Sequence, residues 1–311
     1  MENNYAVRTN DLTKKFGNRI AVDALNIEIR QGDIFSLLGT NGAGKTTTIK
    51  MLCCLLIPTS GSATVMGNEI GKNPVKIKEI IGVSPQETAV ALHLTTRENL
   101  LLMGGVFGLN RDLTGKRAKD LMQLMELEDR KDQVRKLSGG MQRRLSIAMA
   151  LMSDPQILFL DEPTLGLDPH ARKSVWNYIE KLKREKTILL TTHYLEEADA
   201  LADNIAIMDQ AKIIALGTSS ELKNKYSTVR TLKISADNIS VEIFNNVKNP
   251  DWEVIKTISG VEIKAAEIDF NMIIDLLRSK DIRIKGIQFL EPTLNDVFLR
   301  LTGKEVINET V

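Results

Sequence analysis

The sequence has little cysteine and no long apolar run. Of its 311 residues two are cysteines, the neighbours Cys53 and Cys54. A disulfide framework needs more cysteines at wider spacing, so we expect two buried structural thiols. The longest uninterrupted apolar run, Met51–Ile57, has seven residues, whereas a membrane-spanning helix needs about 18 or more. The first ten residues lack the apolar region of a secretion signal. We therefore expect a cytoplasmic chain that does not cross a bilayer by itself.

The sequence also lacks an excess of charge of either sign. Its 41 Lys and Arg residues balance 40 Asp and Glu residues, for a net charge of +1. A nucleic-acid-binding domain usually carries a clear basic excess, so we expect no nucleic-acid partner. The hydrophobic fraction of 43% is ordinary for a soluble globular protein. The length favours about two domains.

The first two thirds of the chain alternate between short apolar runs and longer helical stretches, a pattern typical of a parallel α/β sheet. Strands are predicted at residues Asp33–Leu38, Ile80–Val83, Ile157–Leu160, Thr187–Thr191 and Ile205–Met208. A helix is predicted over Gly44–Leu56, ended by Pro58. Residues from about 87 to 137 are charged and rich in Leu and Met at helical spacing, with Thr96 and Asn99 near a helix start. We interpret this segment as a helical subdomain inserted into the sheet domain.

The composition changes after Tyr226, and we place a domain boundary there, between residues 1–225 and 226–311. Strand-like stretches are Val229–Ser235, Trp252–Ile258 and Arg283–Phe289. A final helix is marked by Thr293 as its N-cap, Asp296 three residues later and Gly303 as its end. The second domain is predicted to be a small α+β domain.

The strongest motif follows the first predicted strand of the sheet. It comprises Gly39, Thr40, Asn41, Gly42, Ala43, Gly44, Lys45 and Thr46, followed by Thr47. These residues fit the phosphate-loop pattern, and the flanking strand and helix supply the context that the pattern requires. Glycines let backbone N–H groups close around phosphate oxygens, and the helix N-terminus adds a positive dipole. We expect Lys45 to reach the β and γ phosphates and Thr46 to bind Mg²⁺; the alternative is a plain structural turn.

Two acids end the apolar strand at 157–160. An interior strand ordinarily avoids charge unless something pairs with it. Mg²⁺ bound by Asp161 would supply that pairing, and Glu162 would polarise the water that attacks the γ-phosphate. The alternative is an ordinary strand end turning into solvent.

A second anion site is predicted at Leu137–Gln142. Ser138 caps a long helix, and Gly139 and Gly140 leave its first N–H groups exposed. Since the phosphate loop already cradles a nucleotide, this second cradle favours a nucleotide held by another copy of the protein. At this point the sequence resembles the ATP-binding subunits of ABC transporters, whose signature motif extends here to Gln142. In that family two subunits sandwich two ATP molecules head to tail, each between one phosphate loop and the other subunit's signature.

The resemblance covers residues 5 to 225 and implies four further site residues. Phe16 would stack on adenine, although sequence alone favours a core or turn aromatic. Gln86 would sense Mg²⁺ and the attacking water and link to a membrane subunit. Asp168 would cross the dimer interface. His193 would contact the γ-phosphate, whereas a lone His at a strand end is more often structural.

The tail gives a narrower resemblance. Residues Glu291–Phe298 resemble the C-terminal element of ATPases that serve drug-resistance and related ABC-2-type exporters, although Asn295 stands where that family often has Asp. The resemblance implies a P-loop ATPase that dimerises with itself or with a paired ATPase subunit. It would lie on the cytoplasmic face of the cell membrane and drive a multi-span permease subunit.

Two alternatives stay open on the sequence. A soluble signature-type ATPase acting on nucleic acid or ribosomes would share the catalytic motifs. DNA-repair members carry a long coiled coil between phosphate loop and signature, and no sustained heptads stand there. An importer ATPase also shares every catalytic motif, and only the tail favours export.

Overall fold

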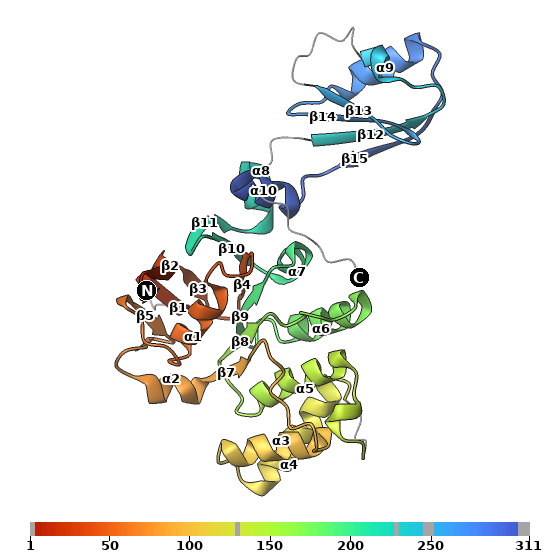
Figure 1. The fold of residues 1–311 in the computed structure, drawn as a ribbon. Helices are drawn as coiled ribbons and strands as arrows, with labels where there is room; N and C mark the ends of the chain where they lie inside the picture. The colour runs from red at the N-terminus through yellow and green to blue at the C-terminus, as the bar shows by residue number, and fades with distance from the viewer. Residues whose placement is uncertain (1–3, 128–130, 227–229, 245–251, 304–311) are drawn as a thin grey trace. The chain divides into compact units, whose positions relative to one another are not determined.

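The computed structural model describes residues 4–127, 131–226, 230–244 and 252–303. The chain divides into two compact units (Figure 1), the first reaching Ser219 and the second beginning at Ser220. The division lies earlier than the predicted boundary after residue 225. The difference concerns helix α8 (Ser219–Tyr226), whose Tyr226 carbonyl accepts a hydrogen bond from Arg300, near the end of the second unit. That helix groups with the tail rather than with the sheet domain.

A six-stranded sheet forms the centre of the first unit. Its order is β11-β10-β4-β9-β8-β7, and all neighbours are parallel except the edge pair β10 and β11. The strands are β4 (Ile34–Gly39), β7 (Ile81–Ser84), β8 (Ile157–Asp161), β9 (Thr187–Thr192), β10 (Asn204–Asp209) and β11 (Lys212–Gly217). The five predicted strands and the parallel α/β class are confirmed; β11 was not predicted.

Both faces of this sheet are buried, because alternate strand residues enter two different cores. Phe35, Phe159 and Leu189 pack with α1 (Lys45–Leu52) and an N-terminal sheet. Leu160 and Leu190 pack on the other side with three helices and the helical subdomain. These helices are α5 (Gly139–Leu151), α6 (Pro169–Lys181) and α7 (Leu195–Leu201).

Helix α1 ends at Leu52, earlier than the predicted Leu56. Cys54 has a φ of 56°, and the N–H groups of Leu55 and Leu56 turn back to the Lys50 carbonyl. This turn ends the helix several residues before Pro58. Cys53 is buried as predicted, whereas Cys54 is only partly buried; both are free thiols, and burial raises the pKa of each.

The N-terminal antiparallel sheet was not predicted. It contains β1 (Tyr5–Phe16), β2 (Arg19–Leu25), β3 (Glu28–Arg30), β5 (Ser60–Val65) and β6 (Asn68–Glu69). Asp11 and Ala24 have positive φ angles, and the pairing register of β1 shifts with three of its partners. These irregularities interrupt the period-two alternation by which a strand is recognised in sequence.

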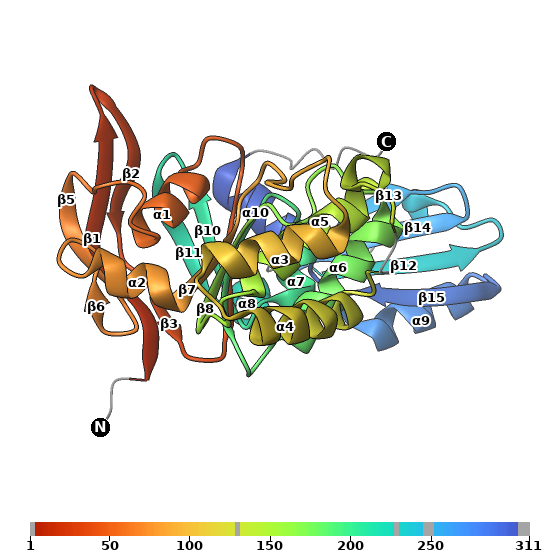
Figure 2. The same cartoon turned by 90° about the horizontal axis from the view of Figure 1, so that it is seen from below.

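The predicted helical segment contains less helix than expected. Its helices are α3 (Thr96–Val106), α4 (Arg111–Leu124) and a short 3₁₀ turn at Val134–Lys136, and residues 87–95 form a loop. Thr95 rather than Thr96 is the N-cap of α3, in a capping box with Glu98. The buried side chain of Asn99 bonds the backbone N–H and C=O of Ala91 and so anchors the loop. Figure 2 shows α3 and α4 side by side; α2 (Pro74–Ile80) precedes β7.

The second unit is an antiparallel sheet with helices, as predicted. Its order is β13-β14-β12-β15, from β12 (Arg230–Ala236), β13 (Glu253–Lys256), β14 (Gly260–Ala265) and β15 (Ile284–Leu290). Helix α9 (Phe270–Ser279) packs Ile273 and Leu277 on one face. Strand β14 was not predicted, and the predicted strand start at Val229 lies outside the described residues.

The last helix, α10 (Leu294–Thr302), has the predicted caps. Thr293 and Asp296 form a capping box, and Gly303 closes the helix with a φ of 67°. Leu294, Val297 and Phe298 are buried, and Arg300 bonds the end of α8. Within the described part of the chain, the search for a helix both long and apolar enough to cross a membrane found none.

The contact between α3 and α4 gives a paired test of the helical subdomain. A Cβ at Gly104 would lie 2.3 Å from Thr114 Cγ2, whereas a Cβ at Gly105 would meet nothing within 4 Å. We expect Gly104→Ala to lower the free energy of unfolding by about 1–3 kcal/mol through overpacking. Gly105→Ala should raise it by about 0.5–1 kcal/mol, because alanine loses less backbone entropy in a helix. Chemical denaturation of both variants checks this, and equal stabilisation by both would contradict the packing.

Candidate active site

The phosphate loop joins β4 to α1 in a backbone path that only glycine fits at two points. A Cβ at Gly39 would lie 2.3 Å from the Met208 carbonyl oxygen. Gly44 has a φ of 111°, and a Cβ there would lie 2.4 Å from the Ala21 carbonyl oxygen. The loop therefore stays close to its neighbours and leaves backbone N–H groups at the start of α1 for an anion.

Lys45, Glu162 and His193 meet in one cluster although they are far apart in sequence; Lys45 and Glu162 are buried and His193 is partly buried. The Lys45 Nζ lies 2.7 Å from the Gly39 carbonyl oxygen and 3.0 Å from Glu162 Oε1. The other carboxylate oxygen of Glu162 lies 2.8 Å from His193 Nδ1. The structure thus brings together three of the four residues predicted to be catalytic.

The electrostatic balance of this cluster keeps Glu162 ionised. Burial alone would raise the pKa of Glu162, but the hydrogen bond from His193 and the charge of Lys45 outweigh it and lower that pKa below its ordinary value. Because the pKa of Glu162 is lower in the folded than in the unfolded protein, its contacts stabilise the fold at neutral pH. That stabilisation is lost as the pH falls through the folded-state pKa of Glu162. Glu162 is therefore a carboxylate at neutral pH, the form that can accept a proton.

Asp161 lies beside this cluster and is held by two hydroxyl groups. Thr46 Oγ1 donates to Asp161 Oδ1 at 3.0 Å, and Thr191 Oγ1 donates to the same oxygen at 2.6 Å. Thr191 was not predicted as a site residue. It faces Asp161 because β8 and β9 are neighbours with these two residues in register; the sequence does not reveal which strands are adjacent.

A cavity of about 270 Å³ joins the phosphate loop to Glu162. It is lined by Arg19, Ala21, Asn41, Gly42, Gly44, Lys45, Thr46, Thr47, Gln86 and Glu162. Eight of these residues were predicted, six of them from the loop motif and the other two being Gln86 and Glu162. Arg19 and Ala21 come from β2 and were missed, because the N-terminal sheet was not predicted. The donor set fits a nucleotide with its metal: N–H groups and cations for phosphate oxygens, and a hydroxyl and a carboxylate for Mg²⁺.

The signature residues do not line this cavity. Ser138 caps α5, its Oγ accepting from the Met141 N–H, and Gly139 and Gly140 open the helix. The Gln142 side-chain amide donates to the carbonyls of Val134 and Leu137, so it holds the preceding turn. A nucleotide contact for this glutamine stays a prediction.

Phe16 and Asp168 also lie outside the cavity lining. Phe16 ends β1 with half of its surface exposed and the Lys14 ammonium 5.1 Å from its ring centre, which excludes the core alternative. Asp168 caps α6 by accepting from the N–H groups of His170 and Ala171. These N–H bonds lower the pKa of Asp168. The adenine and dimer-interface roles of the two residues stay predictions.

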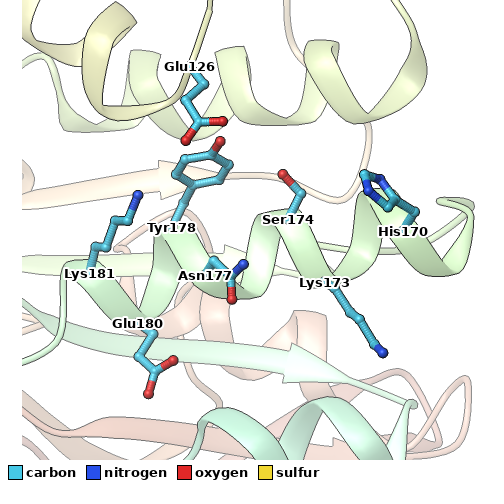
Figure 3. Close-up of a pocket in the computed structure, with 8 residues that line it drawn as sticks. All are labelled: Glu126, His170, Lys173, Ser174, Asn177, Tyr178, Glu180 and Lys181. Atoms are coloured by element: carbon cyan, nitrogen blue, oxygen red, sulfur yellow. The ribbon is translucent and has the colours of Figure 1, made fainter.

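A larger hollow, of about 690 Å³, lies along α6 (Figure 3). Its lining residues are Glu126, His170, Lys173, Ser174, Asn177, Tyr178, Glu180 and Lys181. None of the predicted site residues is among them, and the side chains include both acids and bases. Figure 3 shows the Tyr178 hydroxyl directed at Glu126. The candidate active site is therefore the smaller cavity beside the phosphate loop.

The parallel sheet, the phosphate loop and the buried Glu162 define a P-loop ATPase. Residues 22–165 match the family described as ABC transporter, and residues 217–302 match the family described as ATP-binding protein DrrA1-3-like, C-terminal domain. The chain belongs to the ABC transporter ATP-binding proteins and carries the DrrA-like C-terminal domain. It therefore binds and hydrolyses ATP.

Relatives match along nearly the whole chain. The daunorubicin resistance ATP-binding protein DrrA2 of Streptomyces coeruleorubidus is 37% identical over 98% of this chain and 97% of its own length. The Nod factor export ATP-binding protein I of Rhizobium sp. (strain N33) is 37% identical over 94% of this chain and 95% of its own. The linearmycin resistance ATP-binding protein LnrL of Bacillus subtilis (strain 168) is 34% identical over 96% and 98%.

Solved structures match the larger part of the chain. A dimeric ATP-binding cassette in a post-hydrolysis state, bound to ADP and Pi, has a TM-score of 0.62 and 28% identity over 68% of this chain and 98% of that one. CbiO1 from Clostridium perfringens, part of the ABC transporter complex cbiONQ, has a TM-score of 0.65 and 26% identity over 72% and 94%. Both share the ATPase fold.

The position of Lys45 predicts a loss of nucleotide binding when its charge is removed. Truncating one partner of a buried charged contact costs about 2–5 kcal/mol, so Lys45→Ala should weaken ATP binding about 30-fold or more. Lys50→Ala, an exposed lysine on the same helix, is the matched control and should bind normally. Calorimetric titration of both variants with ATP measures the effect. Affinity of a folded Lys45→Ala protein within about threefold of the wild type would contradict the role.

Proposed function

We propose that this chain is the ATP-hydrolysing motor subunit of an ABC exporter, driving a separate multi-span permease from the cytoplasmic face of the membrane. The observation that carries the proposal is the Lys45–Glu162–His193 cluster at a phosphate loop. The chain that contains this cluster matches resistance and export ATP-binding proteins over nearly its full length. Importer and exporter ATPases share the catalytic motifs, so these motifs do not tell export from import. The DrrA-like C-terminal domain does, and it supports export.

Each residue of the site has a separate role in the proposed hydrolysis of ATP. Glu162, ionised and buried, is placed to take the proton of the attacking water, and His193 orients its carboxylate from the opposite oxygen. Lys45 and the loop N–H groups would hold the phosphates. Thr46, Asp161 and Gln86 would hold Mg²⁺, which would supply charge neutralisation on the β and γ oxygens. Catalysis here is positioning and charge stabilisation rather than covalent chemistry.

Two copies, or this chain and a paired subunit, would complete each other's sites. Ser138, Gly139 and Gly140 do not line the phosphate-loop cavity, and they form the N-cap and the first two residues of α5. A dimeric relative with ADP and Pi shares this fold. The arrangement supports a head-to-tail dimer with two ATP molecules at the interface.

Glu162→Gln tests hydrolysis and dimerisation together. Glutamine keeps the shape of the side chain but cannot accept the proton, so the hydrolysis rate should fall about 10²- to 10⁴-fold. With Mg²⁺ and ATP the variant should accumulate as a dimer in size-exclusion chromatography with light scattering. The control is Glu196→Gln, which replaces an exposed carboxylate on α7. This variant should hydrolyse ATP at the normal rate and should not accumulate as a dimer. A Glu162→Gln protein that binds ATP and remains monomeric would count against the dimer.

An apolar groove of about 430 Å³ on the first unit supports the permease contact. Its lining includes Cys53 and Leu55 after α1, Val83 and Pro85 at the end of β7, and Phe107 after α3. Pro85 precedes Gln86, so an occupant would touch the loop that reaches the nucleotide cavity. We propose that a helix of the membrane subunit binds here, with Leu55 and Phe107 exposed at its rim.

If the permease binds in this groove, a single charge introduced there should release the protein from membranes. Phe107→Asp should weaken the permease contact by about 2 kcal/mol or more, because the new carboxylate would lose its water against an apolar partner without gaining a counter-ion. In fractionated cells the variant should move from the membrane pellet to the supernatant and keep its affinity for ATP. Leu216→Asp, on the exposed edge strand β11 and outside the groove, is the control. Unchanged sedimentation of Phe107→Asp would refute this docking surface.

A further inference from the structure

Arg143 is a buried cation whose hydrogen bonds go to backbone carbonyl oxygens. It lies in the second turn of α5 with 4% of its surface exposed. Its Nη1 lies 2.5 Å from the Pro85 oxygen, its Nη2 lies 2.7 Å from the Asp161 oxygen, and its Nε lies 2.8 Å from the Pro163 oxygen. Nη1 is also 3.3 Å from the Gln86 oxygen. One guanidinium thus bonds four carbonyls.

These carbonyls belong to the two segments that border the nucleotide cavity. Pro85 and Gln86 follow β7, and Gln86 lines the cavity. Asp161 and Pro163 flank Glu162 at the end of β8. Because the guanidinium is planar and its donors form a rigid fork, it fixes the separation of the two segments in a way that a single ammonium cannot.

The helix that carries Arg143 is itself attached along β7. Ser146, three residues further along α5, has its Oγ 2.9 Å from Ser84 Oγ. A Cβ at Gly82 would lie 2.3 Å from the Ala150 carbonyl oxygen, so the strand and the helix pack at backbone distance. Residues three, four and seven apart lie on one helix face. The face of α5 that carries Arg143 therefore follows β7 from Gly82 to Gln86.

The charge of Arg143 persists in this setting. Burial lowers the pKa of Arg143 to about 10, and the carboxylates of Glu197, Asp161 and Glu162 oppose that lowering. The guanidinium stays protonated at neutral pH. Its carbonyl bonds are charge-assisted and stronger than bonds between neutral groups.

We propose that Arg143 is a positioning residue for ATP hydrolysis: it holds the Gln86 loop at a fixed distance from Glu162 and joins both to α5, the helix that Ser138 caps. Arg143 acts through the backbone of its partners. The proposal rests on the ATPase activity of the chain and is independent of the permease and of the direction of transport.

Arg143→Lys tests the fork without removing the charge. A displacement of about 1 Å of a catalytic group can cost about 10²-fold in rate. We therefore expect kcat to fall about 10- to 100-fold, with KM for ATP within about threefold of the wild type. Arg144→Lys is the matched control, since Arg144 is the next residue of the helix but bonds the Met125 carbonyl and the Tyr178 hydroxyl. It should leave kcat within about threefold of the wild type.

A second measurement separates positioning from a general loss of stability. Amide hydrogen exchange should become faster at residues 86–87 and 162–165 in Arg143→Lys and stay unchanged there in Arg144→Lys. The thermal unfolding midpoints of both variants report folding. Wild-type kcat in Arg143→Lys, equal losses in the two variants, or unchanged exchange at both segments would each overturn the proposal.

Discussion

The buried charge of Glu162 is the constraint on which the rest of the site depends. A carboxylate with about one twentieth of its side chain exposed needs compensation, because burying an uncompensated ion costs several kcal/mol. Lys45 supplies a cation from the phosphate loop, and His193 supplies a hydrogen bond from the end of β9. The same contacts that neutralise the charge therefore fix three separate segments around one cavity.

The sheet topology makes these contacts short. β4, β9 and β8 are consecutive and parallel, so their carboxyl ends, which carry Gly39, His193 and Asp161, meet at one edge. Thr46 and Thr191 both donate to the same carboxylate oxygen of Asp161 and so hold it next to the first turn of α1. Arg143 connects these strand ends to the loop of Gln86, since it donates to backbone carbonyls on both sides of Glu162 and to that of Gln86. The strand ends that carry the candidate catalytic residues are therefore also the segments that Arg143 holds together.

Much of the site was predictable because phosphate binding requires particular residue types at fixed spacing. The loop, Asp161 and Glu162 were recognised from local sequence, and five strands of the sheet from their continuous apolar runs. Thr191, Arg19 and Arg143 were not, because each acts on a residue far away in the chain and its role depends on which elements are adjacent. The N-terminal sheet was missed since positive φ angles at Asp11 and Ala24 and shifts of register break its alternation. Likewise, helix α1 was predicted too long because a left-handed Cys54 ends it before any proline.

We propose that this ATPase works on a membrane protein. The most direct test is to purify the chain from gently solubilised native membranes and to identify what accompanies it in stoichiometric amount. We expect a multi-span protein without ATPase motifs of its own, whose recovery falls when the apolar groove carries a charge. Recovery of the chain alone from the soluble fraction, or together with ribosomes or nucleic acid, would leave the ATPase chemistry intact and contradict the transport function.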